Sequence, residues 1–169
     1  MSELEKIKED YVTQWGALGS QWGINRTMAM IHAMLLVSPE PVNTDAVMES
    51  LSISRGNANT NLRELVGWGL VRNVIVKGKR KDHYEAEKDV WKIFCIVARE
   101  RKRRETEPAS KVLADCIERC KGIKSAEAKA LRKQLGELNE FVTLANSIME
   151  KIASKEKSSL APKLLKLLS

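Results

Sequence analysis

The stretch Leu51–Val71, LSISRGNANTNLRELVGWGLV, decides the fold of this chain. Its apolar residues recur at the spacing of one helical face: Ala58, Leu62, Leu65 and Val66. Ser54 stands just before them, where its hydroxyl can accept a hydrogen bond from an unpaired backbone N–H as an N-cap. Gly67 and Gly69 flank the end of the pattern, and glycine tolerates the positive φ that ends many helices. The pattern predicts a helix that starts after Ser54.

The remaining faces of this predicted helix carry polar and basic side chains. They are Arg55, Asn57, Asn59, Thr60 and Arg63, and Ser54 precedes them. Guanidinium groups, amides and hydroxyls are the groups that bind base edges and phosphates in the major groove of DNA. We therefore predict that this helix is the recognition helix of a DNA-binding domain.

A pair of extended segments follows the predicted recognition helix. The β-branched run Val71–Val76 leads into the basic turn Lys77–Lys81, and a second extended segment spans His83–Ala86. Four side chains of the turn are expected to contact phosphates or to enter the adjacent minor groove: Lys77, Lys79, Arg80 and Lys81. Helix, strand, turn and strand in this order predict a winged helix-turn-helix domain, in a chain that is mainly α with a small β wing.

Segments before the recognition helix complete this domain. An amphipathic helix runs from Leu4 to Leu18, and a more apolar helix, Arg26–Val37, follows with Asn25 as its N-cap. A short strand at Val42 and a third helix, Asp45–Leu51, which Thr44 or Asn43 caps, then lead into the recognition helix.

Particular motifs give the segment a family resemblance. They are the Ser54-Arg55-Gly56-Asn57 start of the recognition helix, its Trp68-Gly69-Leu70-Val71 end, and the wing sequence KGKRKDHYEAE at 77–87. Over roughly residues 20–100 the chain resembles the MarR-like winged-helix repressors, and most of all their GbsR-type branch, which is related to regulators of choline and betaine uptake. The resemblance implies a homodimeric transcription factor, and it does not fix the effector.

The charge of the chain is positive and unevenly distributed. Its 169 residues have a formal net charge of +7. Between Ser52 and Lys81 there are seven basic residues, and Glu64 is the only acid. A basic patch on a recognition element indicates a polyanionic partner, here double-stranded DNA. A solvated surface without a partner is the alternative.

Nothing in the sequence indicates export or membrane insertion. The start, Met1–Lys6, lacks the apolar core of a signal peptide, and no apolar run is long enough to span a bilayer. The three cysteines, Cys95, Cys116 and Cys120, are odd in number and lack CxxC spacing, which favours a reducing compartment. We expect a cytoplasmic protein.

The segment after the wing is predicted to be helical with one break. A helix begins at Lys88, and its predicted apolar side comprises Val90, Trp91, Phe94, Val97 and Ala98. It ends in a basic run, 99–104, which suits either a solvated surface or phosphate contacts. Pro108 predicts a break at Glu105–Ser110, followed by a short amphipathic helix that Gly122 closes.

A heptad pattern marks the next helix. Its members are Leu131, Leu135, Leu138, Val142, Ala145, Met149 and Ile152. So long an apolar stripe needs a partner, and we predict that it forms the interface of a symmetric homodimer. A last helix is predicted near Leu160–Leu168. The predicted organisation is an N-terminal packing or dimerisation helix at 1–22, the winged helix-turn-helix domain at 23–88 and a helical dimerisation region at 89–169.

No catalytic, metal or cofactor site is predicted. The two histidines, His32 and His83, lie outside any known catalytic or zinc-binding spacing, and no glycine motif for phosphate binding is present. Cys116 and Cys120 lie one helical turn apart, where core packing and oxidant sensing are both open. The chain is therefore not expected to be an enzyme.

Tryptophans suggest a ligand pocket. Trp15, Trp22 and Trp91 are candidates for an aromatic cage around a small cationic effector, although large aromatic residues also pack in cores. The expected function is a sequence-specific DNA-binding transcriptional regulator, a repressor that binds a pseudo-palindromic operator as a homodimer and is open to control by a small ligand. The alternative is a winged-helix protein-interaction module without base-specific DNA binding.

Overall fold

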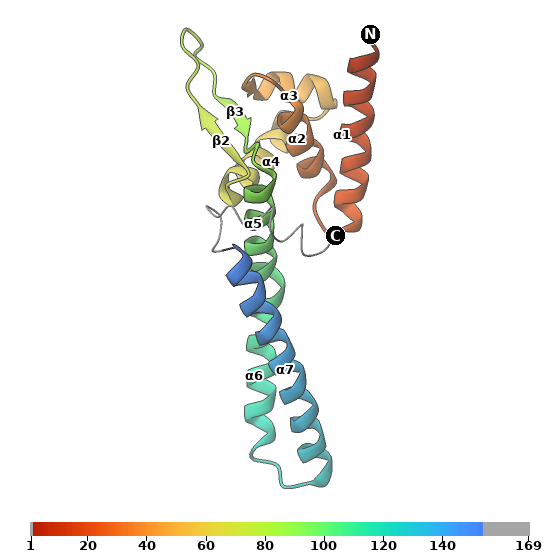
Figure 1. The fold of residues 1–169 in the computed structure, drawn as a ribbon, viewed down its shortest axis with the longest axis vertical. Coiled ribbons are helices and arrows are strands. Elements are labelled where there is room, and N and C mark those ends of the chain that lie inside the picture. Colours follow the sequence, from red (N-terminus) through yellow and green to blue (C-terminus); the bar gives the residue numbers. More distant parts are fainter. Residues whose placement is uncertain (1, 154–169) are drawn as a thin grey trace, which may run out of the picture. The chain divides into compact units, whose positions relative to one another are not determined.

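The computed structural model describes residues 2–153. The chain divides into two compact units, Met1–Ile93 and Phe94–Ser169, and both are seen in Figure 1. The described residues are mainly helical, with one small antiparallel sheet in the first unit. The predicted fold class, mainly α with a small β wing, is confirmed.

The first unit has the element order of a winged helix-turn-helix domain. Its elements are α1 (Glu3–Gln21), α2 (Arg26–Val37), β1 (Val42–Asn43), α3 (Thr44–Leu51), α4 (Arg55–Trp68), β2 (Val71–Val74) and β3 (His83–Ala86). The strands pair antiparallel in the order β1-β3-β2, and Val71 of β2 lies opposite Ala86 of β3. The β2–β3 hairpin projects from this sheet as the wing (Figure 1).

Local capping sets the start of each helix around the helix-turn-helix. The side chains of Asn25, Asn43 and Ser54 accept hydrogen bonds from backbone N–H groups in the first turns of α2, α3 and α4. These caps confirm the predicted starts of α2 and α4, whereas α3 begins one residue before the predicted Asp45, with Asn43 as its cap. Gly67 and Gly69 lie on either side of Trp68, the last residue of α4, as predicted, and Gly69 ends the helix with a φ of +85°.

The core of the first unit lies where α2 and α4 pack together. Ile31, Leu35, Leu62 and Leu65 are buried there, whereas Val66 is 39% exposed. The prediction that Val66 packs inward is wrong, because the helical face turns away from the core at that position.

Glycine allows α1 to approach α2 closely. A Cβ atom added at Gly16 would lie 2.4 Å from Cγ of Met30, and one at Gly19 would lie 2.5 Å from Cβ of Ala29. A larger residue at either position would therefore push the two helices apart. This contact joins α1 to the same unit as the helix-turn-helix.

Lys88 caps the end of α2. Its Nζ donates hydrogen bonds to the backbone oxygens of Leu35, Leu36 and Ser38, at 2.8, 2.6 and 2.9 Å. The last turn of α2 has no basic residue of its own, so this ammonium satisfies carbonyls that would otherwise lack partners. The helix that was predicted to begin at Lys88 begins two residues later, as α5 (Val90–Arg101), and Lys88 lies in the segment before it.

The second unit continues as helix where a break was predicted. A π-helical turn (Lys102–Thr106, drawn within the helical ribbon of Figure 1) leads directly into α6 (Glu107–Cys120), and a turn connects α6 to α7 (Ala126–Ala153). The predicted break at Glu105–Ser110 is wrong. Pro108 lies in the first turn of α6, where its missing N–H is tolerated, and the wider π turn lies just before it.

The apolar side of α5 also differs from the prediction. Val90 is 76% exposed and Phe94 is 49% exposed, whereas Cys95, Ile96 and Ala98 are buried. The spacing of the apolar residues was compatible with burial of either of two adjacent faces of α5. In the structure the face that contains Cys95 is the buried one. The predicted last helix near Leu160–Leu168 lies outside the described residues.

Candidate nucleic-acid interface

Helix α4 buries its apolar side and exposes a polar one. Ala58, Leu62 and Leu65 are buried against the rest of the first unit. The candidate DNA-binding side chains of α4 are exposed or, for Asn59, half-buried: Ser54, Arg55, Asn57, Asn59, Thr60 and Arg63. The structure thus places every residue predicted for base or phosphate contact where a partner can reach it.

Asn61 is a buried residue that the sequence prediction missed. Its Nδ2 donates to the backbone oxygen of Asn57 at 2.9 Å and to Asn57 Oδ1 at 2.7 Å. A buried amide therefore holds the exposed Asn57 side chain in one orientation. The signal was present in the sequence, because Asn61 is a polar residue at a position that faces the core.

The start of α4 is joined to the base of the wing through one carboxylate. Asp45 in the first turn of α3 accepts from Nη2 of Arg55 at 2.6 Å and from Nζ of Lys81 at 2.5 Å. These three residues line a polar hollow of about 480 Å³. Its other lining residues are Thr44, Asn59, Arg80, Asp82 and Tyr84. The two hydrogen bonds, first that of Lys81 and then that of Arg55, hold the pKa of Asp45 below its usual range.

The tip of the wing is strongly basic. Gly78 adopts a φ of +81° in the hairpin turn, a conformation that favours glycine. Lys77, Lys79 and Arg80 are exposed, and no carboxylate of residues 2–153 pairs with them. By contrast, Arg72 on β2 pairs with Glu85 on β3 at 2.9 Å. The wing therefore offers uncompensated charge at its tip and ion-paired charge on its strands.

The basic run at the end of α5 is paired within the second unit. Arg101 lies 3.6 Å from Glu105, Lys102 lies 2.9 Å from Glu150, and Arg103 bonds to Glu100 at 2.7 Å. The contact with Glu150 is the main cause that raises the pKa of Lys102. These carboxylates favour the solvated-surface interpretation of the run over phosphate contacts.

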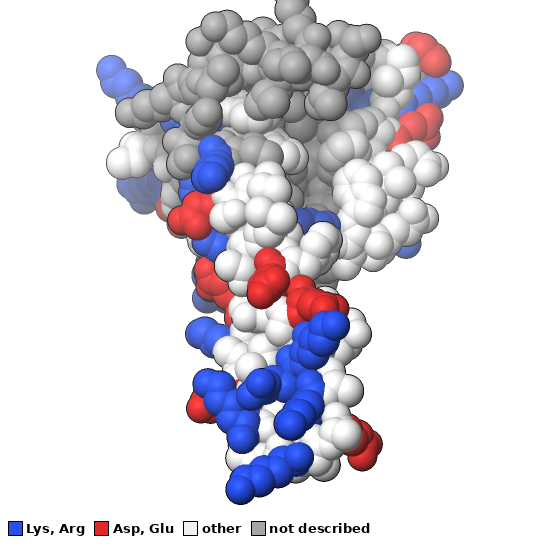
Figure 2. All heavy atoms as spheres, turned by 60° about the horizontal axis from the view of Figure 1, so that its bottom comes forward, with Lys and Arg blue, Asp and Glu red and all other residues white. Residues whose placement is uncertain are grey.

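A second basic surface lies where α6 turns into α7. Figure 2 shows Lys and Arg side chains gathered over this end of the hairpin. The exposed basic residues on either side of the turn are Arg119, Lys121, Lys124, Lys129, Arg132 and Lys133. Three of them pair with carboxylates one helical turn away: Arg119 with Asp115, Lys121 with Glu118 and Lys133 with Glu137. The charge of this surface is therefore partly compensated, whereas that of the wing tip is not.

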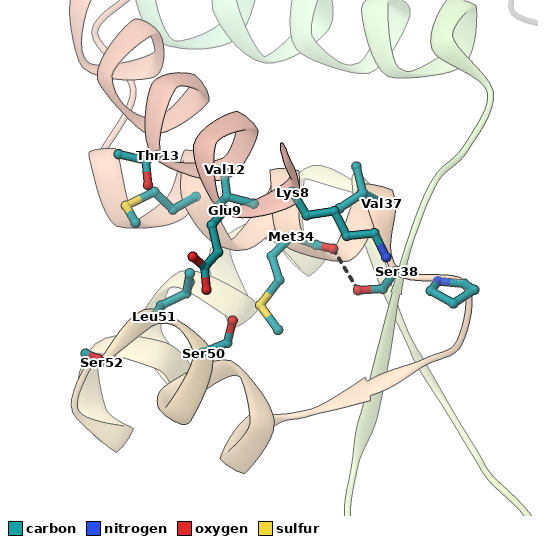
Figure 3. A pocket seen from close by; sticks show the side chains of 12 residues that line it. Lys8, Glu9, Val12, Thr13, Met34, Val37, Ser38, Ser50, Leu51 and Ser52 are labelled. Carbon is teal, nitrogen blue, oxygen red and sulfur yellow. Dashed lines mark hydrogen bonds between the residues drawn. The ribbon is translucent and has the colours of Figure 1, made fainter. Parts of the chain in front are cut away.

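The first unit contains a cavity of about 380 Å³ between α1, α2 and the end of α3 (Figure 3). Met30, Met34, Val37 and Leu51 are among its apolar lining residues. The charged side chains of Lys8 and Glu9 reach toward it from α1. The cavity borders Ser50–Ser52, the segment that leads into α4.

The tryptophans expected to form a ligand pocket do not line this cavity. Trp15 contacts Trp22 edge to face, with ring centroids 5.8 Å apart, and Trp15 also contacts Tyr11 at 5.6 Å. Trp22 is exposed and Trp91 is half-buried. The aromatic group on α1 is therefore a feature separate from the cavity.

The histidines and cysteines have structural surroundings. His83 is buried at the base of the wing, with Nδ1 2.8 Å from the backbone oxygen of Lys81. His32 is buried in α2, and burial together with the nearby charge of Lys88 lowers its pKa to about 4. Cys116 is half-buried and Cys120 is buried, and both are free thiols.

Within residues 2–153, no group of three or more His, Cys, Asp or Glu side chains could hold a metal ion. No helix within residues 2–153 has the length and apolar character needed to cross a bilayer.

Comparisons with known proteins point to one class. No family model matches the chain. The chain is 20% identical over 94 residues to the Bacillus subtilis (strain 168) protein named "Putative HTH-type transcriptional regulator YvaV"; the match covers 56% of this chain and about half, 53%, of that protein. A crystal structure described as a transcriptional regulator matches with a TM-score of 0.56 and 20% identity, over 85% of this chain and 98% of that one. The structural match supports the fold.

Proposed function

We propose that this protein is a sequence-specific DNA-binding transcriptional regulator that acts as a homodimer. The exposed polar side of α4, beside the uncompensated charge of the wing tip, is the observation that carries the proposal. The name of the Bacillus subtilis relative supports the same class. The wing sequence at 77–87 further favours a repressor of the MarR-like, GbsR-type class, with a small molecule as its effector.

Each part of the candidate interface has a distinct role in this proposal. Asn57, Thr60 and Arg63 read base edges in the major groove, and the wing tip holds backbone phosphates through Lys77, Lys79 and Arg80. A two-fold dimer presents two copies of α4 to successive major grooves about 34 Å apart, so its operator is pseudo-palindromic.

The dimer interface is proposed on α7. Leu131, Leu138, Phe141, Leu144 and Ile148 are exposed and form a continuous apolar face at helical spacing. Other members of the heptad, Leu135, Val142, Ala145 and Met149, are half-buried. The side chain of Ile152 lies outside the described part of the chain. An apolar face of this length indicates a protein interface, and a second copy of the same face is its simplest partner.

Substitution of Thr60 tests base recognition. Thr60 is exposed on α4 and its replacement disturbs no hydrogen bond of Asn61, whereas Asn57→Ala would. Thr60→Ala should lower the ratio of operator to scrambled-duplex affinity about tenfold, and the slope of log affinity against log salt should stay constant because phosphate neutralisation is unchanged. The operator is first selected from a random DNA pool.

The matched control is Thr143→Ala, the same change at an exposed threonine of α7. It should leave both affinities unchanged. If the wild-type protein selected no preferred sequence, or if substitutions along the exposed side of α4 left the ratio unchanged, base reading would be ruled out. A winged-helix protein-interaction module would then be the better description.

A further inference from the structure

Asp45, on α3, joins the start of the next helix, α4, to the base of the wing. Its Oδ1 pairs with Arg55, the first residue of α4, and its Oδ2 pairs with Lys81, which is 36 positions away at the base of the wing. Each carboxylate oxygen therefore serves one cation. The recognition helix and the wing are linked through a single side chain of α3.

The position of this carboxylate is unexpected for a DNA-binding surface. The hollow around it is lined by three basic residues, Arg55, Arg80 and Lys81, and the negative charge of Asp45 offsets part of their attraction for a phosphate. Asp82 is the other acid of the hollow. It has no ion pair with any residue of the described chain.

Folding stability is a weak explanation for Asp45. The side chains of Arg55, Lys81 and Asp45 are all at least one-third exposed, and exposed ion pairs add little to stability. The start of α3 is already capped by Asn43, whose Oδ1 accepts from the N–H of Ala46. What the two ion pairs do is fix the positions of Arg55 and Lys81 relative to each other.

We propose that Asp45 is a positioning residue for DNA recognition, which holds Arg55 of the recognition helix and Lys81 of the wing in one preset arrangement. This inference rests on the proposed function. Two long side chains that are ordered before binding lose less conformational freedom when they meet the correct site. The same carboxylate also disfavours DNA that does not match the arrangement, because its charge opposes misplaced phosphates.

Asp45→Asn should therefore reduce selectivity while it increases general affinity. The variant releases both cations and removes one negative charge. Scrambled duplex should bind several-fold more tightly, the salt slope should steepen by up to about one unit, and the operator-to-scrambled ratio should fall about fivefold. Circular dichroism and thermal melting should match the wild-type protein.

Asp82→Asn is the matched control, since it removes the same charge from the same hollow without breaking a bridge. It should change operator and scrambled affinities by the same factor and leave their ratio constant. Amide hydrogen exchange provides a readout without DNA. Residues 75–82 should exchange faster in Asp45→Asn than in Asp82→Asn.

A double-mutant cycle tests the link directly. Arg55→Ala and Lys81→Ala should be coupled in the wild-type background, so that the operator affinity of the double variant differs about threefold or more from the product of the single effects. The coupling should disappear when Asp45→Asn is also present. The coupling between Arg55→Ala and Lys81→Ala is measured with Asp45 intact. The proposal can therefore still be tested if Asp45→Asn fails to fold.

The outcomes separate this inference from the proposed function. A wild-type protein without operator preference would overturn both. Operator preference in the wild type, combined with equal ratios in Asp45→Asn and Asp82→Asn, would overturn only the role of Asp45. Additive effects of Arg55→Ala and Lys81→Ala would overturn it as well.

Discussion

Helices α4 and α7 both have apolar residues at helical spacing, but they differ in what they leave exposed. In α4 the apolar side is buried in the first unit, and the exposed side carries amides, a hydroxyl and guanidinium groups. In α7 one apolar stripe is half-buried, and another remains exposed, with Phe141 at 68% and Leu144 at 58%.

This difference separates two kinds of partner. Water satisfies exposed hydrogen-bond donors and positive charge until a polyanion replaces it, so the exposed side of α4 needs no permanent partner and suits the proposed contact with DNA. Exposed apolar side chains gain free energy only when another apolar surface covers them. The same spacing in the sequence therefore supports a proposed DNA contact in one helix and a proposed protein contact in the other.

The largest expected effect is on the buried side of α4. Leu62→Ala should lower the free energy of unfolding of the first unit by about 2–5 kcal/mol, because the side chain is buried and its removal leaves a cavity. All four tryptophans lie in Met1–Ile93, so tryptophan fluorescence in urea reports on this unit. The control Val66→Ala, on the exposed side, should change stability by about 0.5 kcal/mol or less. Equal decreases would mean that the two sides of α4 do not differ.

Charge on the exposed face of α7 should dissociate the proposed dimer. Phe141→Lys with Ile148→Lys places two unpaired charges in an apolar interface, and the dissociation constant should rise about a thousandfold, or roughly 4 kcal/mol. The helix should stay folded, because both side chains are exposed within one chain. Sedimentation velocity measures the change. Thr143→Lys with Ser147→Lys adds the same charge outside the apolar face and should remain dimeric; a dimeric Phe141/Ile148 variant would move the interface elsewhere.

Acid should destabilise the first unit through His32. Burial, with the charge of Lys88, lowers the pKa of His32 to about 4 in the folded state, against 6.5 for an unperturbed histidine. Between these values the unfolded chain binds a proton that the folded chain does not, so the free energy of unfolding should fall as pH drops from 6.5 to about 4, by at most roughly 3 kcal/mol. The residues 94–169 contain no histidine.

The contribution of His32 is measured as a difference between proteins. Urea titrations at several pH values compare the wild type with His32→Leu, so that the carboxylates, which titrate in both, cancel. The free energy of unfolding of His32→Leu should depend less on pH than that of the wild-type protein. A wild-type protein with the same slope as the variant would mean that His32 is protonated in the folded state.

The smallest expected effect concerns the wing tip. Lys79→Ala with Arg80→Ala should weaken operator and scrambled DNA by the same factor, and the salt slope should decrease by about one unit for each phosphate that the variant no longer neutralises. Arg72→Ala is the control, because its guanidinium pairs with Glu85 and should contribute no phosphate contact. If Arg72→Ala changed the salt slope and the Lys79→Ala/Arg80→Ala variant did not, the strands of the wing, and not its tip, would be the surface that contacts DNA.

Local features of the fold were predictable from the sequence. The caps at Asn25 and Ser54, the span of α2 and the order of helix, strand, turn and strand around the wing agree with the structure. Such features depend on residues within a few positions of one another, through backbone hydrogen bonds and helical spacing. The exposure of Asn57 and Thr60 followed from the same spacing.

The sequence by itself therefore determined the fold class, the helix Arg55–Trp68 with its polar side, and the positive charge of the wing. Only the tertiary structure decided that Lys88 caps α2, that Asp45 joins Arg55 to Lys81, and which apolar stripe of α7 stays exposed. The physical reason is separation along the chain. A contact between residues dozens of positions apart leaves no periodic signal, and a helix with two adjacent apolar stripes has no preferred inward side until its neighbours pack against it.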